Sequence, residues 1–169
     1  MSAVPLFALG AVLAMMGVEL RISQRNEKRL RGEGAMEPPD DVYQSMRFVY
    51  PLCFISMAAE GWLRGPSRNL IPVAGLLVLL TSKALKTWVI VSLGSNWSFH
   101  VLVRPRHRLV TRGPYRYIRH PNYLAIAGEI IGMALLVGAP ITGVISLGAM
   151  GLLLRKRIAV EERALGLRA

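Results

Sequence analysis

Residues 107–123 have the sequence HRLVTRGPYRYIRHPNY, in which arginines and a Gly-Pro turn are followed by a proline at the start of a long apolar segment. Between residues 94 and 122 the chain contains six arginines and no carboxylate. The positive field of such a loop is uncompensated in sequence, and it attracts an anionic or electron-rich ligand. We therefore expect the functional site at this loop, where it meets the apolar segment.

The rest of the chain is apolar enough to predict a membrane protein. Its 169 residues have room for one domain, and a hydrophobic content of 53% exceeds that of an average soluble domain. Apolar stretches occupy residues 3–20, 46–63, 70–93, 123–137 and 141–154. Because about 20 apolar residues cross a bilayer as a helix, we predict an all-α integral membrane protein with about five transmembrane helices.

The last two apolar stretches are short by roughly one turn, and Gly138-Ala139-Pro140 separates them, which predicts a tight helical hairpin. A single membrane domain over residues 1–169 then has two parts. Residues 1–92 form three helices and a cytoplasmic loop, and residues 93–169 form the basic loop, the hairpin and a tail. The first stretch has neither a basic start nor a cleavage site, so we expect it to be a retained helix.

The distribution of positive charge predicts the orientation in the membrane. Lys and Arg number five in residues 21–45, six in residues 94–122 and five from residue 155 onward, against two in residues 64–69 and none at the hairpin turn. In a five-helix chain the three rich segments share one side, so the positive-inside rule places the N-terminus outside and the C-terminus in the cytoplasm. The net charge of +11 is thereby explained without nucleic acid, and we predict no nucleic-acid partner.

Ionisable residues inside the apolar stretches are costly in a membrane, where they pair with each other or line a cavity. For Glu129 we favour a paired or cavity-facing role. For Glu60, Lys83 and Lys86 the alternative of interfacial snorkelling stays open. Residues 21–44 have five charges of each sign, and we interpret them as a solvated interface segment followed by a turn. With one cysteine and no His-x3-His spacing, the sequence predicts no metal site.

Two features at the predicted cytoplasmic side indicate a cofactor-binding or catalytic site. Pro121 occupies the position that proline prefers in the first helical turn, so the free N–H groups of this helix form an anion site beside Arg119 and His120, suited to a carboxylate-bearing cofactor. Arg157 and Glu161 are four residues apart and share one helix face. The plainer alternatives are a basic membrane flank with a helix start and a solvated charge pair.

These motifs carry a family resemblance. The sequence HRLVTRGPYRYIRHPNYLA, an apolar hairpin and then RIAVEERAL resemble the isoprenylcysteine carboxyl methyltransferase family, whose members have H-x-L-V-x-x-G-x-Y, R-H-P-x-Y and R-x3-E-E-x2-L in this order. The resemblance covers about residues 93–165. It implies an integral membrane methyltransferase that uses S-adenosylmethionine, with S-adenosylhomocysteine as product, bound between the loop and the hairpin.

The resemblance also implies roles for residues. Arg157 would meet the substrate as the catalytic residue. The implied cofactor contacts are His107, Arg108, Leu109, Val110, Tyr115, His120, Pro121, Asn122, Tyr123 and Glu161.

The N-terminal half of the sequence indicates which branch of this family the chain resembles. Its Glu19-Leu20, Arg25-Asn26-Glu27-Lys28, Gly34-Ala35 and Glu37 resemble small bacterial members beside type III polyketide synthases, which are similar to O-methyltransferases of alkylpyrones and alkylresorcinols. This implies methyl transfer to an acidic oxygen of a lipophilic substrate, at the cytoplasmic face of a bacterial inner membrane. The implied partners are that substrate and membrane lipids, with no obligate protein partner.

Three alternatives stay open from the sequence. The first is a prenylcysteine carboxylate as the methylated group. The second is an NADPH-dependent membrane reductase of the sterol type, whose C-terminal part has a similar arginine-rich, Pro-Asn-Tyr pattern. The third is a non-catalytic lipid-binding membrane protein.

Overall fold

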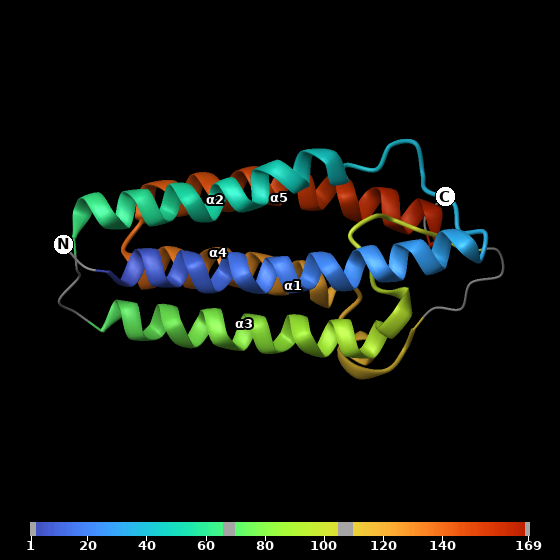
Figure 1. Ribbon diagram of the computed structural model, residues 1–169, viewed down its shortest axis with the longest axis horizontal. Coiled ribbons are helices and arrows are strands. Elements are labelled where there is room, and N and C mark those ends of the chain that lie inside the picture. Colours follow the sequence, from blue (N-terminus) through green and yellow to red (C-terminus); the bar gives the residue numbers. More distant parts are fainter. Residues whose placement is uncertain (1–2, 66–69, 105–109, 168–169) are drawn as a thin grey trace.

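The computed structural model describes residues 3–65, 70–104 and 110–167, which form one elongated helical bundle (Figure 1). Its long helices are α1 (Val4–Gly32), α2 (Tyr43–Arg64), α3 (Ile71–Leu93), α4 (Pro121–Val137) and α5 (Pro140–Ala164). Two short 3-10 turns, η1 (Gly94–Asn96) and η2 (Gly113–Arg116), lie between α3 and α4. The described residues contain no β-strand, so the predicted all-α class is confirmed.

The helix boundaries follow local sequence signals. α4 begins at Pro121 as predicted, because proline fits the first helical turn. It ends at Val137, and the following Gly138 has a φ of +71°, which is left-handed and favours glycine. α1 extends beyond its apolar stretch to Gly32, because the Arg, Gln, Glu, Lys and Leu residues that follow are good helix formers.

α3 and α4 pack closely because glycines face the neighbouring backbone. A Cβ atom on Gly132 would lie 2.5 Å from the Leu79 backbone nitrogen, and one on Gly75 would lie 2.3 Å from the Leu136 nitrogen. Small residues at such contacts allow helices in membranes to approach each other closely. The pair is therefore closely packed.

Replacement of Gly132 by alanine is expected to destabilise the protein by about 1–3 kcal/mol, since the added methyl group meets backbone that cannot rotate away. The control is Gly148→Ala in α5, where a Cβ meets nothing within 4 Å and the higher helix propensity of alanine is expected to be neutral or slightly stabilising. Thermal unfolding of both variants in mild detergent checks this. Equal midpoints would contradict the close packing of α3 on α4.

Many large apolar side chains lie on the outer surface of the bundle. Exposed large side chains include Phe7, Leu63, Val91, Val144 and Leu152. Two segments, Val4–Gly32 and Ile71–Asn96, are long and apolar enough to cross a membrane, and Pro121–Val137 is apolar but shorter. This fits a membrane protein, while the number of five spans and their orientation stay predictions.

The predicted clustering of basic segments at one end is present. The α1–α2 connection, the α3–α4 connection and the end of α5 all lie at the end of the bundle opposite the chain's N-terminus (Figure 1). Segments far apart in sequence therefore meet at this end, and a cavity lies there.

Candidate active site

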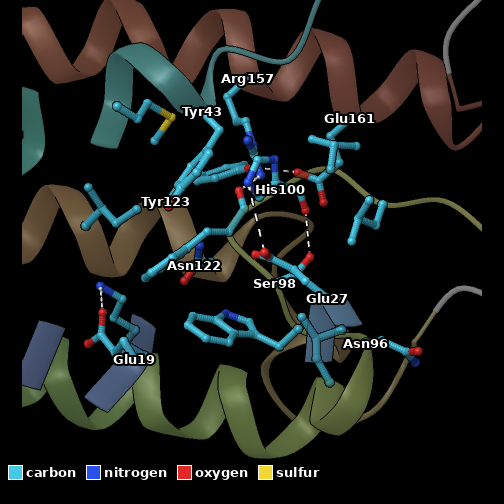
Figure 2. Close-up of a pocket in the computed structure, with 18 of the residues that line it drawn as sticks. Glu19, Glu27, Tyr43, Asn96, Ser98, His100, Asn122, Tyr123, Arg157 and Glu161 are labelled. Carbon is cyan, nitrogen blue, oxygen red and sulfur yellow. Dashed lines mark hydrogen bonds and ion pairs between the residues drawn. The ribbon is translucent and has the colours of Figure 1, made fainter. Parts of the chain in front are cut away.

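A cavity of about 860 Å³ is lined by all five long helices and by the α3–α4 connection. Most of the residues predicted for the site line it, which brings together parts of the chain more than 40 residues apart (Figure 2). The predicted residues in the lining are Val110, Tyr115, His120, Asn122, Tyr123, Arg157 and Glu161. Pro121 is buried as the first residue of α4, outside this lining. The predicted contacts His107, Arg108 and Leu109 lie outside the described residues.

Glu161 of α5 connects to the start of α4. The Tyr123 hydroxyl donates a hydrogen bond of 2.5 Å to the Glu161 carboxylate. Burial raises the pKa of the Tyr115 phenol, and the nearby negative charge of Glu161 raises it further. The phenol of Tyr115 is therefore a neutral hydrogen-bond donor at physiological pH, close to the Glu161 carboxylate.

His120 connects the same two elements. Its ring stacks on Tyr123 with 5.6 Å between centroids, and its Nε2 atom lies 3.1 Å from a carboxylate oxygen of Glu162. Glu162 was not among the predicted site residues. The adjacent glutamates 161 and 162 were the available signal for a second acidic residue in the site. Because neighbouring residues on a helix point about 100° apart, the sequence favoured only Glu161, which shares a face with Arg157.

Arg157 lies on the cavity wall, but its guanidinium is already engaged. One nitrogen donates a 2.5 Å hydrogen bond to Asp41 and the other donates to the Phe99 carbonyl oxygen. Asp41 also accepts hydrogen bonds from the backbone N–H groups of Tyr43 and Val101. Asp41 therefore joins three chain segments around Arg157, and it was missed because nothing next to it in sequence predicts this partner.

The interpretation of residues 21–44 as a solvated interface segment is wrong. Asn26 donates hydrogen bonds to the carbonyl oxygens of Gly94 and Trp97, at 3.1 and 2.8 Å. Ser23, fully buried, accepts a 2.7 Å hydrogen bond from the Phe99 N–H. The part of α1 that extends beyond its apolar stretch thus fixes the loop after α3, because this loop has buried backbone groups that need partners.

The expectation of an uncompensated positive loop also needs correction. Arg104 pairs with Glu33 at 2.6 Å and donates to the Asn96 side chain. Arg112 donates to the Ser92 carbonyl oxygen. The carboxylates absent from residues 94–122 are supplied by the α1–α2 connection, so the local field is smaller than the sequence of the loop indicates.

Glu37 and His100 form a further polar contact, with 2.7 Å between Glu37 Oε1 and His100 Nδ1. Burial opposes ionisation of Glu37, but hydrogen bonds with His100 and Arg31 outweigh it and lower the pKa of this carboxyl below its usual value. A carboxyl with a lowered folded-state pKa contributes stability above its unfolded pKa and loses it as the pH falls through the folded value.

The thermal midpoint is therefore expected to fall as the pH is lowered below about 4.5, the ordinary value for glutamate, and to fall less steeply in a Glu37→Gln variant. Circular dichroism melts between pH 3 and pH 7, roughly the range over which carboxyl groups titrate, measure this slope. If the two proteins show parallel slopes, the ionised Glu37 does not stabilise the fold.

One group of side chains has the spacing of a metal site. The ligating atoms of Glu37, Asp41 and His100 all lie within 4.8 Å of one another. However, Arg31 pairs with Glu37 and Arg157 pairs with Asp41, so two positive charges already neutralise these carboxylates. The electrostatics therefore disfavour a cation here.

A buried ionic cluster lies beside the cavity, and two of its members, Glu19 and Lys86, line it. Lys83 lies 3.2 Å from Glu19 and 2.9 Å from Glu129, and Lys86 lies 2.8 Å from Glu19 and 3.4 Å from Glu129. Each of these four side chains is at most 8% exposed. We call them the charge quartet. Snorkelling is therefore wrong for the two lysines, whereas the paired role favoured for Glu129 is confirmed.

Glu60 has a different role at the opposite end of the bundle. Its carboxylate accepts hydrogen bonds from the Ile141 and Thr142 N–H groups and from the Thr142 hydroxyl. It also pairs with Arg64 at 2.6 Å. Glu60 therefore satisfies free N–H groups at the start of α5 and positions the hairpin.

Relatives of this chain are found over most of its length. Over 159 residues the chain is 30% identical to the uncharacterised protein YpbQ of Bacillus subtilis (strain 168), covering 93% of this chain and 94% of YpbQ. It is also 30% identical over 155 residues to an uncharacterised protein of Haemophilus influenzae, covering 91% of this chain and 90% of that protein.

Enzymes with a stated activity match over a shorter region. The rat and human protein-S-isoprenylcysteine O-methyltransferases are each 32% identical to the chain over 98 residues, which is 56% of this chain and 34% of those enzymes. The family model of the isoprenylcysteine carboxyl methyltransferases matches residues 74–166. This range contains all but the first three residues of α3, the basic loop and the hairpin, which supply much of the cavity wall. The protein therefore belongs to the isoprenylcysteine carboxyl methyltransferase (ICMT) family of membrane methyltransferases.

Proposed function

We propose that this protein transfers a methyl group from S-adenosylmethionine to an acidic oxygen of a lipophilic substrate. The observation that supports this best is the convergence of Tyr115, Tyr123 and Glu161 on one cavity at the basic end of the bundle. These residues come from three elements, and each corresponds to a position at which the family motifs imply a cofactor contact.

The polar groups of the cavity fit this cofactor. Asn122 Oδ1 is buried and has no hydrogen-bond partner among the described residues, although Asn122 lines the cavity. A buried amide oxygen without a partner is unfavourable, so a ligand with a hydrogen-bond donor would satisfy it. The Glu161 carboxylate offers further acceptor capacity, as an amino or hydroxyl group of S-adenosylmethionine requires.

Methyl transfer from this cofactor requires mainly positioning and exclusion of water by the protein. When bound, S-adenosylmethionine supplies an electrophilic methyl group on a positively charged sulfur. The residues of the chain mainly hold the reacting oxygen in line with that methyl group and exclude water. Tyr123 and His120 fix the position of Glu161 and Glu162, and Asp41 fixes Arg157, so the cavity wall is ordered before substrate arrives.

Two substrate classes suit this proposal. The similarity of the N-terminal half to bacterial O-methyltransferases favours an enol or phenol of an alkylpyrone-like polyketide lipid. The rat and human relatives methylate isoprenylcysteine, according to their names, which favours a prenylcysteine carboxylate. Both are amphipathic, and both would place an apolar chain in the bilayer with the polar head at the cytoplasmic level.

The location is part of the proposal. Five membrane-spanning helices, an external N-terminus and a cytoplasmic cavity follow from the positive-inside rule, and they would place the site beside the cytosolic supply of cofactor. The expected partners are the substrate and membrane lipids, without an obligate protein partner.

A methyl-transfer assay with radiolabelled cofactor and purified protein tests the proposal. Lipid extracts serve as acceptors, and Glu161→Gln and Arg157→Ala are compared with the exposed controls Glu33→Gln and Arg163→Ala. We expect the rate of methyl transfer to fall at least about 100-fold in both site variants, as is usual for positioning groups. Both control variants are expected to retain the wild-type rate. Intact transfer by folded Glu161→Gln and Arg157→Ala protein would contradict the assignment.

A thermal-shift measurement distinguishes the proposed activity from the alternative functions. A ligand that binds only the folded state raises the apparent stability, so S-adenosylhomocysteine is expected to raise the melting midpoint and NADPH is not. Stabilisation by NADPH instead would favour a sterol-type reductase, and stabilisation by neither would favour a non-catalytic lipid-binding protein.

A further inference from the structure

Arg157, which the family motifs place at the substrate, is not free to bind an anion. One guanidinium nitrogen donates to Asp41 and another donates to the Phe99 carbonyl oxygen. The side chain is only 7% exposed, so an anionic substrate would reach it only by displacing Asp41, and separation of a buried ion pair is costly. An ionised oxygen in the cavity therefore needs a different positive charge.

Two other arginines in the cavity wall are available for this role. The positively charged residues that line the cavity are Arg47, Lys86, Arg104, Arg119 and Arg157. Lys86 belongs to the charge quartet, and Arg104 pairs with Glu33. Arg47 and Arg119 are exposed, and neither forms an ion pair with a carboxylate within residues 3–65, 70–104 and 110–167.

These two arginines occupy different parts of the cavity wall. Arg119 directly precedes His120 and the start of α4, where the predicted cofactor contacts lie. Arg47 lies on α2, one turn after Tyr43, and the charges of both Arg47 and Arg157 act on the Tyr43 phenol. Arg47 is therefore close to the part of the wall that contains Arg157, on a helix that the family motifs do not include.

Arg47 also lies between the cavity and the outer surface of the bundle. Its guanidinium carbon is 5.6 Å from the centre of the Phe48 ring, and Phe48 is 68% exposed. On the cavity side, Met46 and Tyr50 of the same helix line the wall. Because the apolar stretch of α2 begins at residue 46, Arg47 has the position at which an amphipathic molecule keeps its polar head beside an apolar region.

We propose that Arg47 binds the acidic group of the lipophilic substrate in its ionised form. This inference rests on the proposed function and restricts its substrates to acids that are ionised at neutral pH, such as a prenylcysteine carboxylate or a hydroxypyrone enolate. A guanidinium is permanently charged, and its planar N–H groups match the oxygens of such an anion. A simple phenol, with a pKa of about 10, is neutral and gains less from this contact.

The reaction of such an anion is balanced without transfer of a proton. An electron pair of the ionised oxygen forms the new O–CH3 bond, while the C–S bond of the sulfonium donor breaks and its electron pair remains on sulfur. The opposite charges of the two reacting groups cancel. The methylated product is neutral and loses the charge-assisted hydrogen bonds to Arg47, which favours its release.

The test compares Michaelis constants in purified full-length protein. The acceptors are a long-chain alkyl hydroxypyrone and N-acetyl-S-farnesylcysteine. Each is matched with a neutral analogue as competitive inhibitor, the methyl ether of the pyrone and the carboxamide of the farnesylcysteine. In Arg47→Gln we expect the KM of the methylated acceptor to rise about 10- to 100-fold, the loss of a hydrogen bond between charged groups. The inhibition constant of the neutral analogue and kcat are expected to stay near their wild-type values.

Three further variants show whether the effect belongs to Arg47. Arg47→Lys keeps the charge and is expected to recover part of the affinity for the acceptor. Arg21→Gln removes an exposed arginine of α1 that does not line the cavity, and its KM values are expected to match wild type. Arg119→Gln is expected to raise the KM of S-adenosylmethionine instead of that of the acceptor.

Several outcomes would overturn the assignment. Equal weakening of the ionised acceptor and its neutral analogue, or an equal effect in Arg21→Gln, would mean that Arg47 only anchors the helix at the membrane surface. A rise in the acceptor KM in Arg119→Gln but not in Arg47→Gln would assign the anion to Arg119.

The same assay distinguishes this inference from the function on which it rests. If wild-type protein methylates a long-chain alkylphenol faster than both ionised acceptors, the methyltransferase proposal stands and the inference about Arg47 is wrong. If no acceptor is methylated and S-adenosylhomocysteine does not raise the melting midpoint, the proposed function itself is wrong, and the inference falls with it.

Discussion

Replacement of Asp41 by alanine is expected to lower the free energy of unfolding by about 3–5 kcal/mol, the cost of leaving one partner of a buried ion pair uncompensated. The Asp41 and Arg157 side chains are only 3% and 7% exposed. Asp41 also accepts the backbone N–H groups of Tyr43 and Val101. The substitution therefore removes partners from three chain segments at once.

The adjacent residue provides a matched control for Asp41. Asp40 pairs with Arg163, but these side chains are 48% and 58% exposed, and an exposed pair contributes at most about 1 kcal/mol. Denaturant titration of both alanine variants in detergent, followed by circular dichroism, measures the difference. Similar small losses for Asp40→Ala and Asp41→Ala would show that Arg157 finds another partner or water.

Replacement of Glu129 by leucine is expected to have an effect of similar size, about 3–5 kcal/mol. Its side chain is fully buried, and it contacts Lys83 at 2.9 Å, Lys86 at 3.4 Å and the Tyr50 hydroxyl. Without Glu129, two buried ammonium groups share the single carboxylate of Glu19. The excess positive charge within the bundle causes the loss.

A double substitution checks this explanation. Glu129→Leu with Lys83→Met removes one charge of each sign, so the combined loss is expected to be smaller than the sum of the single losses. Residues in contact within one ion-pair network show such coupling energies of about 0.5–3 kcal/mol. Additive losses in the same denaturant titration would mean that the pairing of Lys83 with Glu129 contributes nothing.

Both predictions concern contacts that the sequence did not predict in full. The start of α4 was predictable, because a proline before an apolar run is a local signal. The pairing of Asp41 with Arg157 was not, since it joins residues 116 positions apart. Local patterns report propensity and periodicity, whereas a hydrogen bond between distant residues depends on how the helices pack.

In the candidate site, too, some residues were predictable from local sequence motifs and others depended on how the helices pack. The family motifs identified Tyr115, His120, Tyr123 and Glu161, and the structure places these residues around one cavity. Motifs from the C-terminal half did not indicate that α1 and the first turns of α2 form much of the wall. The signal was available in the balanced charges of residues 21–44, but such a segment is equally stable when fully solvated.

The sequence by itself determined the all-α class, the helical hairpin, the concentration of positive charge at one end and the family. These properties follow from hydropathy, from proline and glycine at helix ends and from motif order. Only the tertiary structure decided that Lys83 and Lys86 are paired inside the bundle rather than extended to the interface. The reason is physical: a charge is stable at that depth only when opposite charges from other helices meet it, and helix packing determines which residues those are.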